Sequence, residues 1–381
     1  MTDRLRILLV SEPMEYGVLS YIERLLDGLD RTRWEPALAC SPHRMAPQAR
    51  RLVGRLRAEG VRVRHLPFRR RIGVGDAATV LHLLAELRDF RPDVVHLHSS
   101  KAGVIGRALA RRLGIGVLYT PHGTSWQYTG WATGRVQLAL ERALRRATDV
   151  LVAVCPEEAH AFVDQVGFPA ARVRVVRNGV PVPDAGTVAA TRDRTRAALG
   201  IARDDVWAAF VGRLTAEKGL DVLLGALGPA AGIDGLLVVG DGAGRAALEA
   251  AAARCDRPVR FCGYREDVSP FLAAADVFVQ PSRSEGLPFS VLEAMAHGVP
   301  VVGSDVGGVK AALDGCGRVV PPGDPRALAA ALGELARDHG LRRTLGDAGR
   351  RRVAREFGVA AMLAALHETY EGACRAIGRA A

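Results

Sequence analysis

The sequence predicts an α/β fold built from two doubly wound parallel sheets. Short, continuous apolar runs, typical of buried parallel strands, alternate with amphipathic stretches of helical length along the whole chain. The alternation stops once, at the Pro- and Gly-rich segment 181–186 (PVPDAG), and then restarts. A chain of 381 residues also exceeds the roughly 250 residues that one core usually serves. We therefore predict two domains, residues 1–180 and 181–357, followed by a last helix near 358–381.

The expected elements follow this alternation in both halves. In the first half we expect strands at 6–10, 35–39, 61–66, 93–98, 117–120, 150–154 and 173–176, separated by helices at 18–29, 45–59, 76–89, 99–112, 136–146 and 156–166. In the second half we expect strands at 205–211, 235–239, 259–261, 275–279 and 299–303, and helices at 220–227, 245–254, 268–274, 287–297, 325–338, 341–356 and 359–377. The last of these helices carries an apolar stripe at helical spacing, which predicts that it packs against a core.

The charge and composition limit the classes of partner. Lys and Arg outnumber Asp and Glu by 52 to 41, and the net charge of +11 favours anionic partners such as nucleotides, phosphorylated substrates, anionic lipid or nucleic acid. An aromatic content of 5% argues against a base-stacking nucleic-acid groove. The six cysteines show no metal-ligand spacing, which favours thiols in a reducing compartment. With no signal-like start and no apolar run of membrane-spanning length, we expect a cytoplasmic protein.

Two carboxylates stand out in the stretch 280–298, QPSRSEGLPFSVLEAMAHG. Glu285 follows an expected strand within a turn-forming segment, and Glu293 lies inside a helix expected from Leu287, with Pro288 in its first turn. In open α/β sheets the loops at the carboxyl ends of strands bind ligands, and the N–H groups of a helix start suit a phosphate. Because carboxylates accept hydrogen bonds from sugar hydroxyls, the pattern favours a sugar phosphate. Helix capping or a solvated helix surface is the alternative explanation.

Cations and a glycine follow other expected strands. Arg213, directly after Gly212, and Lys218 lie in the loop that follows the first strand of the second half. Arg suits bidentate bonding of a diphosphate, and Lys acts as a point charge. Gly17, at the start of the first helix of the chain, allows a phosphate to approach the backbone. The alternatives are a solvated basic loop and a plain turn glycine.

Two further loops and one histidine complete the candidate set. Gly240 opens the run GDGAG, which lacks the spacing of a dinucleotide fingerprint and predicts a tight turn beside a nucleotide. The run 304–308 (SDVGG) puts two glycines where a backbone comes close to another group. His122, between Pro121 and Gly123 at the carboxyl end of a strand, is a candidate site residue, although a lone histidine is more often structural.

Together these motifs resemble the retaining glycosyltransferases of the GT-B fold, family 4. The stretch QPSRSEGLPFSVLEAMAHGVPVV places two glutamates in the E-x7-E arrangement of that family, and FVGRLTAEKGLDVLL, LVVGDGAG and VRFCGYREDVSPFLAAADVFVQPS occur in its order. In the first half, DVVHLHSSKAGVIGRALARRLGIGVLYTPHG is similar to the branch that builds exopolysaccharide, capsule and O-antigen sugars. The resemblance covers nearly the whole chain. It implies two Rossmann-like domains facing a central cleft, the first for the acceptor and the second for the nucleotide-sugar donor, with the C-terminal helix crossing back to the first domain.

The resemblance also implies roles for individual residues. Arg213 and Lys218 would hold the donor diphosphate, and Glu293 would bond the ribose hydroxyls. Glu285 would contact the donor sugar near its reacting face, and His122 would face the 6-hydroxyl of that sugar. Backbone groups expected to bind the donor are those of Gly17, Gly212, Gly240, Gly286, Leu287 and Pro288. The residues expected on the acceptor side are Tyr16, Ser100 and Lys101.

The function implied is transfer, with retention, of a hexose from a UDP- or GDP-sugar to a hydroxyl acceptor, free or lipid-linked, in polysaccharide or glycolipid biosynthesis. Arg213 and Lys218 would stabilise charge on the leaving phosphate. No Asp-x-Asp metal pair is present, so we expect no cofactor and no metal requirement. The alternatives are a sugar-nucleotide epimerase or phosphorylase of the same fold, a natural-product glycosyltransferase, and a two-lobed sugar-binding protein.

Basic residues in the first half suggest a peripheral contact with anionic lipid on the inner face of a membrane. They lie in the expected helix 45–59 and at Arg69, Arg70 and Arg71. A solvated basic surface is the alternative.

Overall fold

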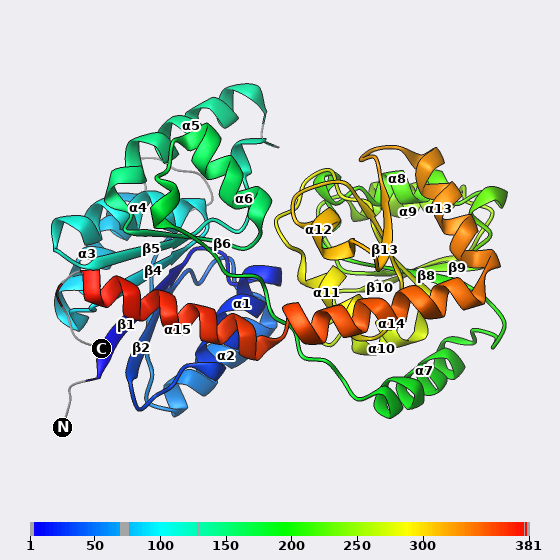
Figure 1. Ribbon diagram of the computed structural model, residues 1–381, viewed down its shortest axis with the longest axis horizontal. Helices are drawn as coiled ribbons and strands as arrows, with labels where there is room; N and C mark the ends of the chain where they lie inside the picture. The colour runs from blue at the N-terminus through cyan, green and yellow to red at the C-terminus, as the bar shows by residue number, and fades with distance from the viewer. Residues whose placement is uncertain (1–3, 69–75, 128–129, 377, 379–381) are drawn as a thin grey trace. The chain divides into compact units, whose positions relative to one another are not determined.

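The computed structural model describes residues 4–68, 76–127, 130–376 and 378, and the chain divides into two compact units (Figure 1). Unit 1 comprises Met1–Arg177 and Ala360–Ala381, and unit 2 comprises Asn178–Val359. The sequence placed the two domain boundaries after residues 180 and 357. In the structure the units change after residues 177 and 359. Arg69, Arg70 and Arg71 lie outside the described residues.

Unit 1 is built on a seven-stranded, parallel sheet in the order β3-β2-β1-β4-β5-β6-β7. Its strands are β1 (Leu5–Ser11), β2 (Trp34–Cys40), β3 (Arg62–His65), β4 (Val94–His98), β5 (Gly116–Thr120), β6 (Val150–Ala153) and β7 (Val173–Val175). Its helices are α1 (Tyr16–Gly28), α2 (Pro47–Ala58), α3 (Ala77–Phe90), α4 (Ser100–Arg112), α5 (Trp131–Leu144), α6 (Pro156–Ala161) and α15 (Val359–Ala376). The strand order reverses between β1 and β4, and in open α/β sheets ligands bind at the carboxyl ends of strands beside such a switch point.

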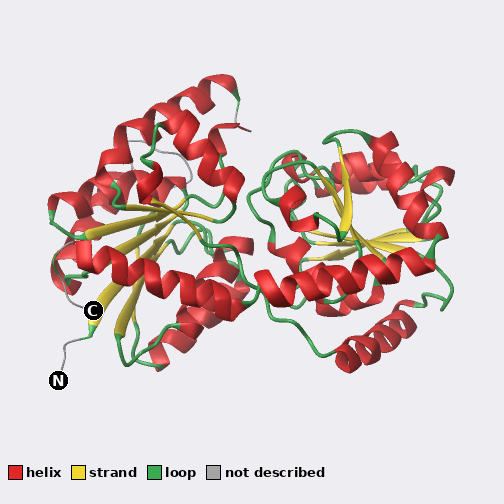
Figure 2. Cartoon of the chain, viewed as in Figure 1, coloured by secondary structure: helices red, strands yellow, loops and turns green. Residues whose placement is uncertain are grey.

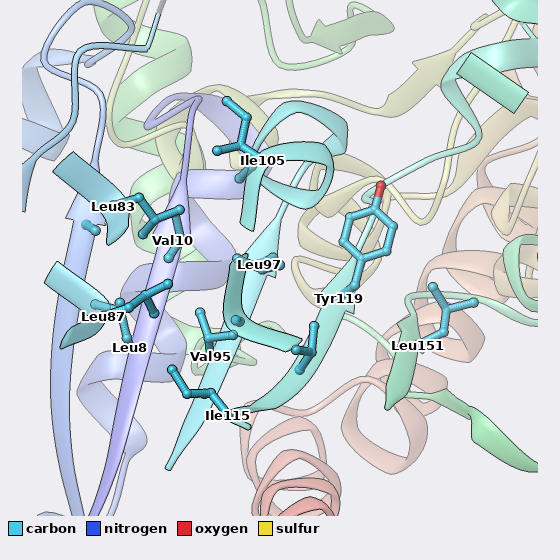
Figure 3. Close-up of a cluster of buried hydrophobic side chains, with 14 of the residues drawn as sticks. Leu8, Val10, Leu83, Leu87, Val95, Leu97, Ile105, Ile115, Tyr119 and Leu151 are labelled. Carbon is cyan, nitrogen blue, oxygen red and sulfur yellow. The ribbon is translucent and has the colours of Figure 1, made fainter. Parts of the chain in front are cut away.

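One hydrophobic cluster of unit 1 fills the space between one face of the sheet and the helices that cover it (Figures 2 and 3), and the alternate strand residues, such as Ile7 and Leu9, are buried on the other face. Apolar side chains of neighbouring strands and of α3 and α4 meet in this cluster, and they include Leu8, Val10, Leu83, Leu87, Val95, Leu97 and Ile105. The continuous apolar runs that predicted buried parallel strands are therefore covered as expected.

The final helix of the chain belongs to unit 1. α15 buries Met362, Leu366 and Tyr370. Its Leu363 packs so tightly over Gly28 of α1 that a Cβ on that glycine would lie 2.0 Å from the leucine. The predicted return of the C-terminal helix to the first domain is confirmed.

Unit 2 repeats the architecture with a six-stranded parallel sheet in the order β10-β9-β8-β11-β12-β13. Its strands are β8 (Trp207–Val211), β9 (Gly235–Val239), β10 (Val259–Gly263), β11 (Val277–Gln280), β12 (Val301–Ser304) and β13 (Gly317–Val320). Its helices are α7 (Ala185–Leu199), α8 (Leu220–Ala226), α9 (Arg245–Ala252), α10 (Ser269–Ala274), α11 (Phe289–Ala296), α12 (Val309–Leu313), α13 (Pro325–Arg337) and α14 (His339–Glu356). The switch point here lies between β8 and β11.

Three elements of unit 2, α7, α12 and β13, were not expected from the sequence. α7 starts at the cap residue Asp184, whose carboxylate accepts a 2.9 Å hydrogen bond from the Thr187 N–H, so the helix takes up the end of the linker predicted at 181–186. Arg196 is the one buried residue of α7, so this helix lacks the apolar stripe that marks an amphipathic helix in a sequence. Among the described residues, no helix has both the length and the apolar character needed to span a bilayer.

Candidate active site

The loops after β8 and β11 bring together two of the charged residues predicted in unit 2. The two strands are neighbours in the sheet, so their carboxyl ends lie side by side at the switch point. Lys218, in the loop after β8, places its Nζ 2.6 Å from Oε1 of Glu285, in the loop after β11. The two side chains are 15% and 7% exposed. Motifs that are far apart in the sequence therefore form one ion pair.

A hydrogen-bond network that begins in β11 fixes the Glu285 carboxylate. Its Oε1 also accepts from Ser282 Oγ at 2.7 Å and from Gln280 Nε2 at 3.0 Å. The Oε1 of Gln280 accepts in turn from Ser290 Oγ of α11 at 2.9 Å. All these bonds to the glutamate end on Oε1, so Oε2 is the oxygen that can face a ligand.

Arg213 lies on the same loop as Lys218. Its Nη2 is 3.7 Å from Oε2 of Glu217, and its side chain is 35% exposed. Arg283, from the loop after β11, holds this turn: its N–H donates to the Glu217 carbonyl at 2.8 Å and its guanidinium to the Ala216 carbonyl at 2.6 Å. The loop that carries both cations is therefore anchored to the loop that carries the glutamate.

Glycines allow the loops at this edge of the sheet to touch backbone to backbone. A Cβ on Gly240 would lie 1.9 Å from the carbonyl oxygen of Gly212, and one on Gly307 (φ 48°) would lie 2.1 Å from a carbonyl oxygen of the loop after β11. Gly308 N–H also donates to the Gly286 carbonyl at 2.7 Å. Because a side chain would force these loops apart, the close backbone approach expected of the run 304–308 is present, with the loop after β11 as the neighbour, and Gly240 approaches the loop after β8 in the same way.

α11 carries the second glutamate of the pair. The helix begins at Phe289, two residues later than expected, because Pro288 has an extended conformation and serves as the N-cap. Glu293 lies on this helix and is half-buried. The carbonyl of Leu287, just before the helix, accepts a 2.6 Å hydrogen bond from Asn178 Nδ2. The start of α11 is thereby tied to the first residue of unit 2.

In unit 1, His122 lies where β5 ends, beside the end of β4. Its Nε2 is 3.1 Å from Nδ1 of His98, and the two rings stack with centroids 5.3 Å apart. The ring of His96 lies 4.1 Å from that of His98. His96 bonds through Nδ1 to the Tyr370 hydroxyl of α15 at 2.7 Å and through Nε2 to the Thr120 hydroxyl at 2.8 Å. A column of three histidines therefore runs from α15 to the carboxyl ends of the strands.

Burial keeps this histidine column uncharged. Burial lowers the pKa of His122 to about 3, and burial aided by the nearby His122 lowers the pKa of His96 to about 3. Burial and the neighbouring histidines hold the pKa of His98 well below its usual value. At neutral pH, His122 can exchange hydrogen bonds with a ligand but carries no positive charge.

The two α4 residues expected on the acceptor side are held inside unit 1. Lys101 is buried, and its Nζ lies 2.8 Å from Oδ1 of Asp76. Its charge is therefore compensated within the unit, and its place on the acceptor side stays a prediction. The Ser100 hydroxyl lies 3.2 Å from the Ser125 hydroxyl.

Tyr16 and Gly17 form the first turn of α1. Tyr16 has a φ of 51°, in the left-handed region that favours glycine. The turn therefore holds a tyrosine in a conformation that usually requires glycine.

Sequence reasoning missed several residues that shape these two edges. Gln280 and Ser282, which orient Glu285, are polar residues at the end of an apolar strand, and that signal could have identified them. The contacts of His98 and of Glu158, whose carboxylate accepts a hydrogen bond from the main chain after His122, depend on tertiary structure. Within the described ranges, no group of three or more His, Cys, Asp or Glu side chains is arranged to hold a metal ion.

Two sequence profiles of known families match the chain, one on each unit. The profile "Glycosyl transferase 4-like domain" matches residues 16–179, and the profile "Glycosyl transferases group 1" matches residues 206–338. Among curated relatives, the D-inositol 3-phosphate glycosyltransferase of Xylanimonas cellulosilytica is 33% identical over 74% of this chain and 72% of its own length. The GDP-mannose-dependent alpha-mannosyltransferase of Mycobacterium tuberculosis is 33% identical over 80% of each chain.

Solved structures share the fold over nearly the full length. Sucrose-phosphate synthase from Thermosynechococcus elongatus superposes with a TM-score of 0.82 at 24% identity, covering 98% of this chain and 100% of that one. HepE from Anabaena in complex with UDP-glucose gives 0.81 at 20% identity, covering 97% and 100%. Two Rossmann-like units of this kind define the GT-B class of enzymes. The chain belongs to the group 1 glycosyltransferases, family 4, and is a glycosyltransferase as its motifs predicted.

Proposed function

We propose that this enzyme transfers a hexose, with retention of configuration, from a UDP- or GDP-sugar to a hydroxyl acceptor in polysaccharide or glycolipid biosynthesis. The observation that carries the proposal is the Lys218–Glu285 ion pair, with Arg213 on the same loop, at the switch point of unit 2. The names of related proteins support it: one is GDP-mannose-dependent, one transfers galactose from UDP-galactose to a diphosphoundecaprenol-linked sugar, and a structure of similar fold holds UDP-glucose.

In the proposed mechanism, the donor diphosphate binds at Arg213 and Lys218. An ammonium group has three N–H donors, so Lys218 can bond a phosphate oxygen while it keeps its bond to Glu285. When the bond between the sugar C1 and the phosphate oxygen breaks, negative charge develops on the β-phosphate, and the two cations stabilise it. A phosphate oxygen then takes the proton of the acceptor hydroxyl, which attacks C1 on the face that the leaving group occupied.

The remaining site residues orient the donor in this proposal. Glu293 bonds the ribose hydroxyls, and Glu285 bonds the donor sugar through Oε2. His122 bonds a hydroxyl of the sugar as a neutral imidazole, because burial lowers its pKa to about 3. A metal has no part in these steps, so we expect turnover to be unchanged by EDTA.

A donor panel tests the proposal. UDP-, GDP- and ADP-hexoses are screened by thermal shift, and the donor that stabilises the protein is supplied with a panel of hydroxyl acceptors. We expect the nucleoside diphosphate to be released. When the anomeric bond of the donor is axial, NMR of the product should also show an axial anomeric bond. Arg213→Ala should lower kcat/KM at least tenfold. The control is Arg318→Ala, which removes an ion pair between Arg318 of β13 and Glu334 of α13 and should leave kcat/KM unchanged. An inverted product would contradict retention, and an equally active Arg213→Ala variant would contradict the phosphate site.

We also propose that unit 1 contacts anionic lipid, as the basic helix 45–59 suggested from the sequence, and that α5 takes part in this contact. In α2, Arg55 is already paired with Asp27 at 2.6 Å and with Glu59 at 3.7 Å. On α5, Trp131 is 77% exposed, and the guanidinium of Arg135 lies 4.8 Å from its ring centroid. Trp and Arg on one exposed helical surface suit the interface of an anionic bilayer.

Co-sedimentation with lipid vesicles tests this contact. The protein should sediment with phosphatidylglycerol vesicles and not with phosphatidylcholine vesicles, and Trp131→Ala with Arg135→Gln should abolish the difference. Arg343→Gln, on an exposed side chain of α14, is the matched control for loss of one charge. Sedimentation that does not depend on anionic lipid would contradict the proposal.

A further inference from the structure

His122 has an unusual backbone conformation for a residue with a side chain. Its φ is 60°, in the left-handed region, and the φ of the following Gly123 is 128°. A residue other than glycine persists in this region when the surrounding structure holds it there, and such residues cluster at functional sites. The groups that hold His122 are therefore part of the site.

Glu158 holds the main chain of this turn. Its Oε1 accepts from the Gly123 N–H at 2.5 Å, and its Oε2 accepts from the Val154 N–H at 2.7 Å. Glu158 is buried, and it joins the end of β5 to the end of β6 through two main-chain hydrogen bonds. Burial raises the pKa of this carboxyl to about 7. Its desolvation therefore costs free energy that an apolar residue at this position would not cost. In return, the two hydrogen bonds of Glu158 fix the position of the turn that carries His122.

His98 holds the ring. Its Nδ1 bonds to Nε2 of His122, and its own ring is buried against His96 and Tyr21, with centroids 4.1 Å and 5.4 Å away. A neutral imidazole has one protonated nitrogen and one bare nitrogen, and a partner on one nitrogen selects the tautomer. Since Nε2 of His122 is occupied, Nδ1 is the ring nitrogen left for a ligand.

We propose that Glu158 and His98 are positioning residues, which fix the main chain and the ring of His122 so that its Nδ1 faces the donor sugar. The idea rests on the proposed function, because it requires His122 to contact the donor. Neither positioning residue touches the substrate; both act through His122. A purely structural role would lower stability without changing the state of the His122 ring or the turnover of the folded enzyme.

Matched variants separate the two roles. His98→Phe keeps a ring of similar size and removes the hydrogen bond, whereas His98→Asn keeps a polar nitrogen near the place of Nδ1. Glu158→Gln leaves one acceptor oxygen for two N–H donors. Glu86→Gln is the control: Glu86 is buried in α3 and pairs with Arg62, on the far edge strand of the sheet.

The expected result is a fall of at least tenfold in kcat for His98→Phe and Glu158→Gln, with KM for the donor changed less than threefold and with partial recovery in His98→Asn. Binding of the nucleoside diphosphate alone, followed by calorimetry, should be unchanged, because unit 2 binds it. Protein labelled with ¹⁵N-histidine should show one tautomer of His122 in wild type and a mixture or the opposite tautomer in His98→Phe. Glu86→Gln should alter only the urea midpoint.

Several outcomes would overturn the proposal. One is a folded His98→Phe enzyme with wild-type kcat and the wild-type His122 tautomer; another is full activity in His122→Ala. If Glu158→Gln does not fold, His98→Phe and His98→Asn still decide the matter. If wild type transfers no sugar, the proposed function fails, while the tautomer measurement still tests whether His98 fixes His122.

Discussion

Removing Lys218 should lower both the free energy of unfolding and kcat/KM. The contacts of Glu285 allow both losses to be estimated. In Lys218→Met the carboxylate keeps its bonds to Ser282 and Gln280 but loses the charged donor 2.6 Å from Oε1. A hydrogen bond to a charged group contributes about 1.5–3 kcal/mol. At 1.36 kcal/mol per factor of ten, kcat/KM should fall roughly 10- to 150-fold. Because the lysine is 15% exposed, we place the loss of unfolding free energy at or just below the low end of the range for a broken buried pair, at about 2–3 kcal/mol.

A double-mutant cycle measures this coupling. Lys218→Met, Glu285→Gln and the double variant are compared by steady-state release of nucleoside diphosphate and by urea unfolding. Residues in direct contact usually couple by about 0.5–3 kcal/mol, so the double variant should lose less than the sum of the single variants. Lys310→Met is the matched control, since it breaks an exposed pair with Asp305 at 3.0 Å and should cost under about 1 kcal/mol.

An additive cycle, or turnover by Lys218→Met within threefold of wild type, would contradict a joint role of Lys218 and Glu285. Additive losses would mean that the two residues act independently, and the convergence of bonds on Oε1 would then have no functional meaning. Normal turnover with lower stability would assign the ion pair to the fold alone.

Three further predictions follow from the same two sheet edges. Glu293→Ala should raise the donor KM about tenfold and change kcat less, if it bonds the ribose; an unchanged KM would refute that role. Gly219→Ala should lower the unfolding free energy by about 2–4 kcal/mol in urea, because φ is 68° and a Cβ would lie 2.0 Å from the Pro281 carbonyl oxygen; a loss below about 0.5 kcal/mol would show that the loops move apart freely. The low pKa values of His96 and His98 give stability that is present above the unfolded value of 6.5 and lost as the pH falls below it. Between pH 6.5 and 5.5, wild type should therefore lose about 2 kcal/mol more than a variant with both histidines replaced by Asn, and parallel pH profiles would contradict the burial argument.

The fold could be predicted from sequence wherever one local pattern dominates. β1, β9 and β11 consist mainly of consecutive apolar residues, and their burial leaves little choice of structure. α7 was missed because its stability comes from polar contacts: Arg192 and Arg196 bond the Asp276 carboxylate and carbonyls before β11. β13 was missed because this short edge strand, GRVV, buries only Val320. Neither element has an apolar period to detect.

The same distinction applies to the site. Arg213, Lys218 and Glu285 could be named because the first two follow β8 and the third follows β11, and the α/β pattern assigns such loops to one edge of the sheet. Other contacts at the two sheet edges depend on pairings across long separations. Asn178 bonds a carbonyl 109 residues away, and His96 bonds a tyrosine 274 residues away. Propensity and periodicity carry no information about such contacts.

The two units share a strand order, but the charges at their carboxyl edges differ in a way that suits different ligands. In unit 2, Arg213 is one-third exposed and Lys218 has N–H donors to spare, so an arriving diphosphate gains charged hydrogen bonds without first breaking the ion pair. In unit 1, Arg44 is bonded to two glutamates and Lys101 to Asp76, and the histidine column is neutral. An anion there would have to compete with carboxylates already in place, whereas a neutral hydroxyl needs only hydrogen-bonding groups. The proposal that unit 2 binds the charged donor and unit 1 the acceptor therefore rests on the exposed Arg213 and on the neutral histidine column, rather than on the sheets.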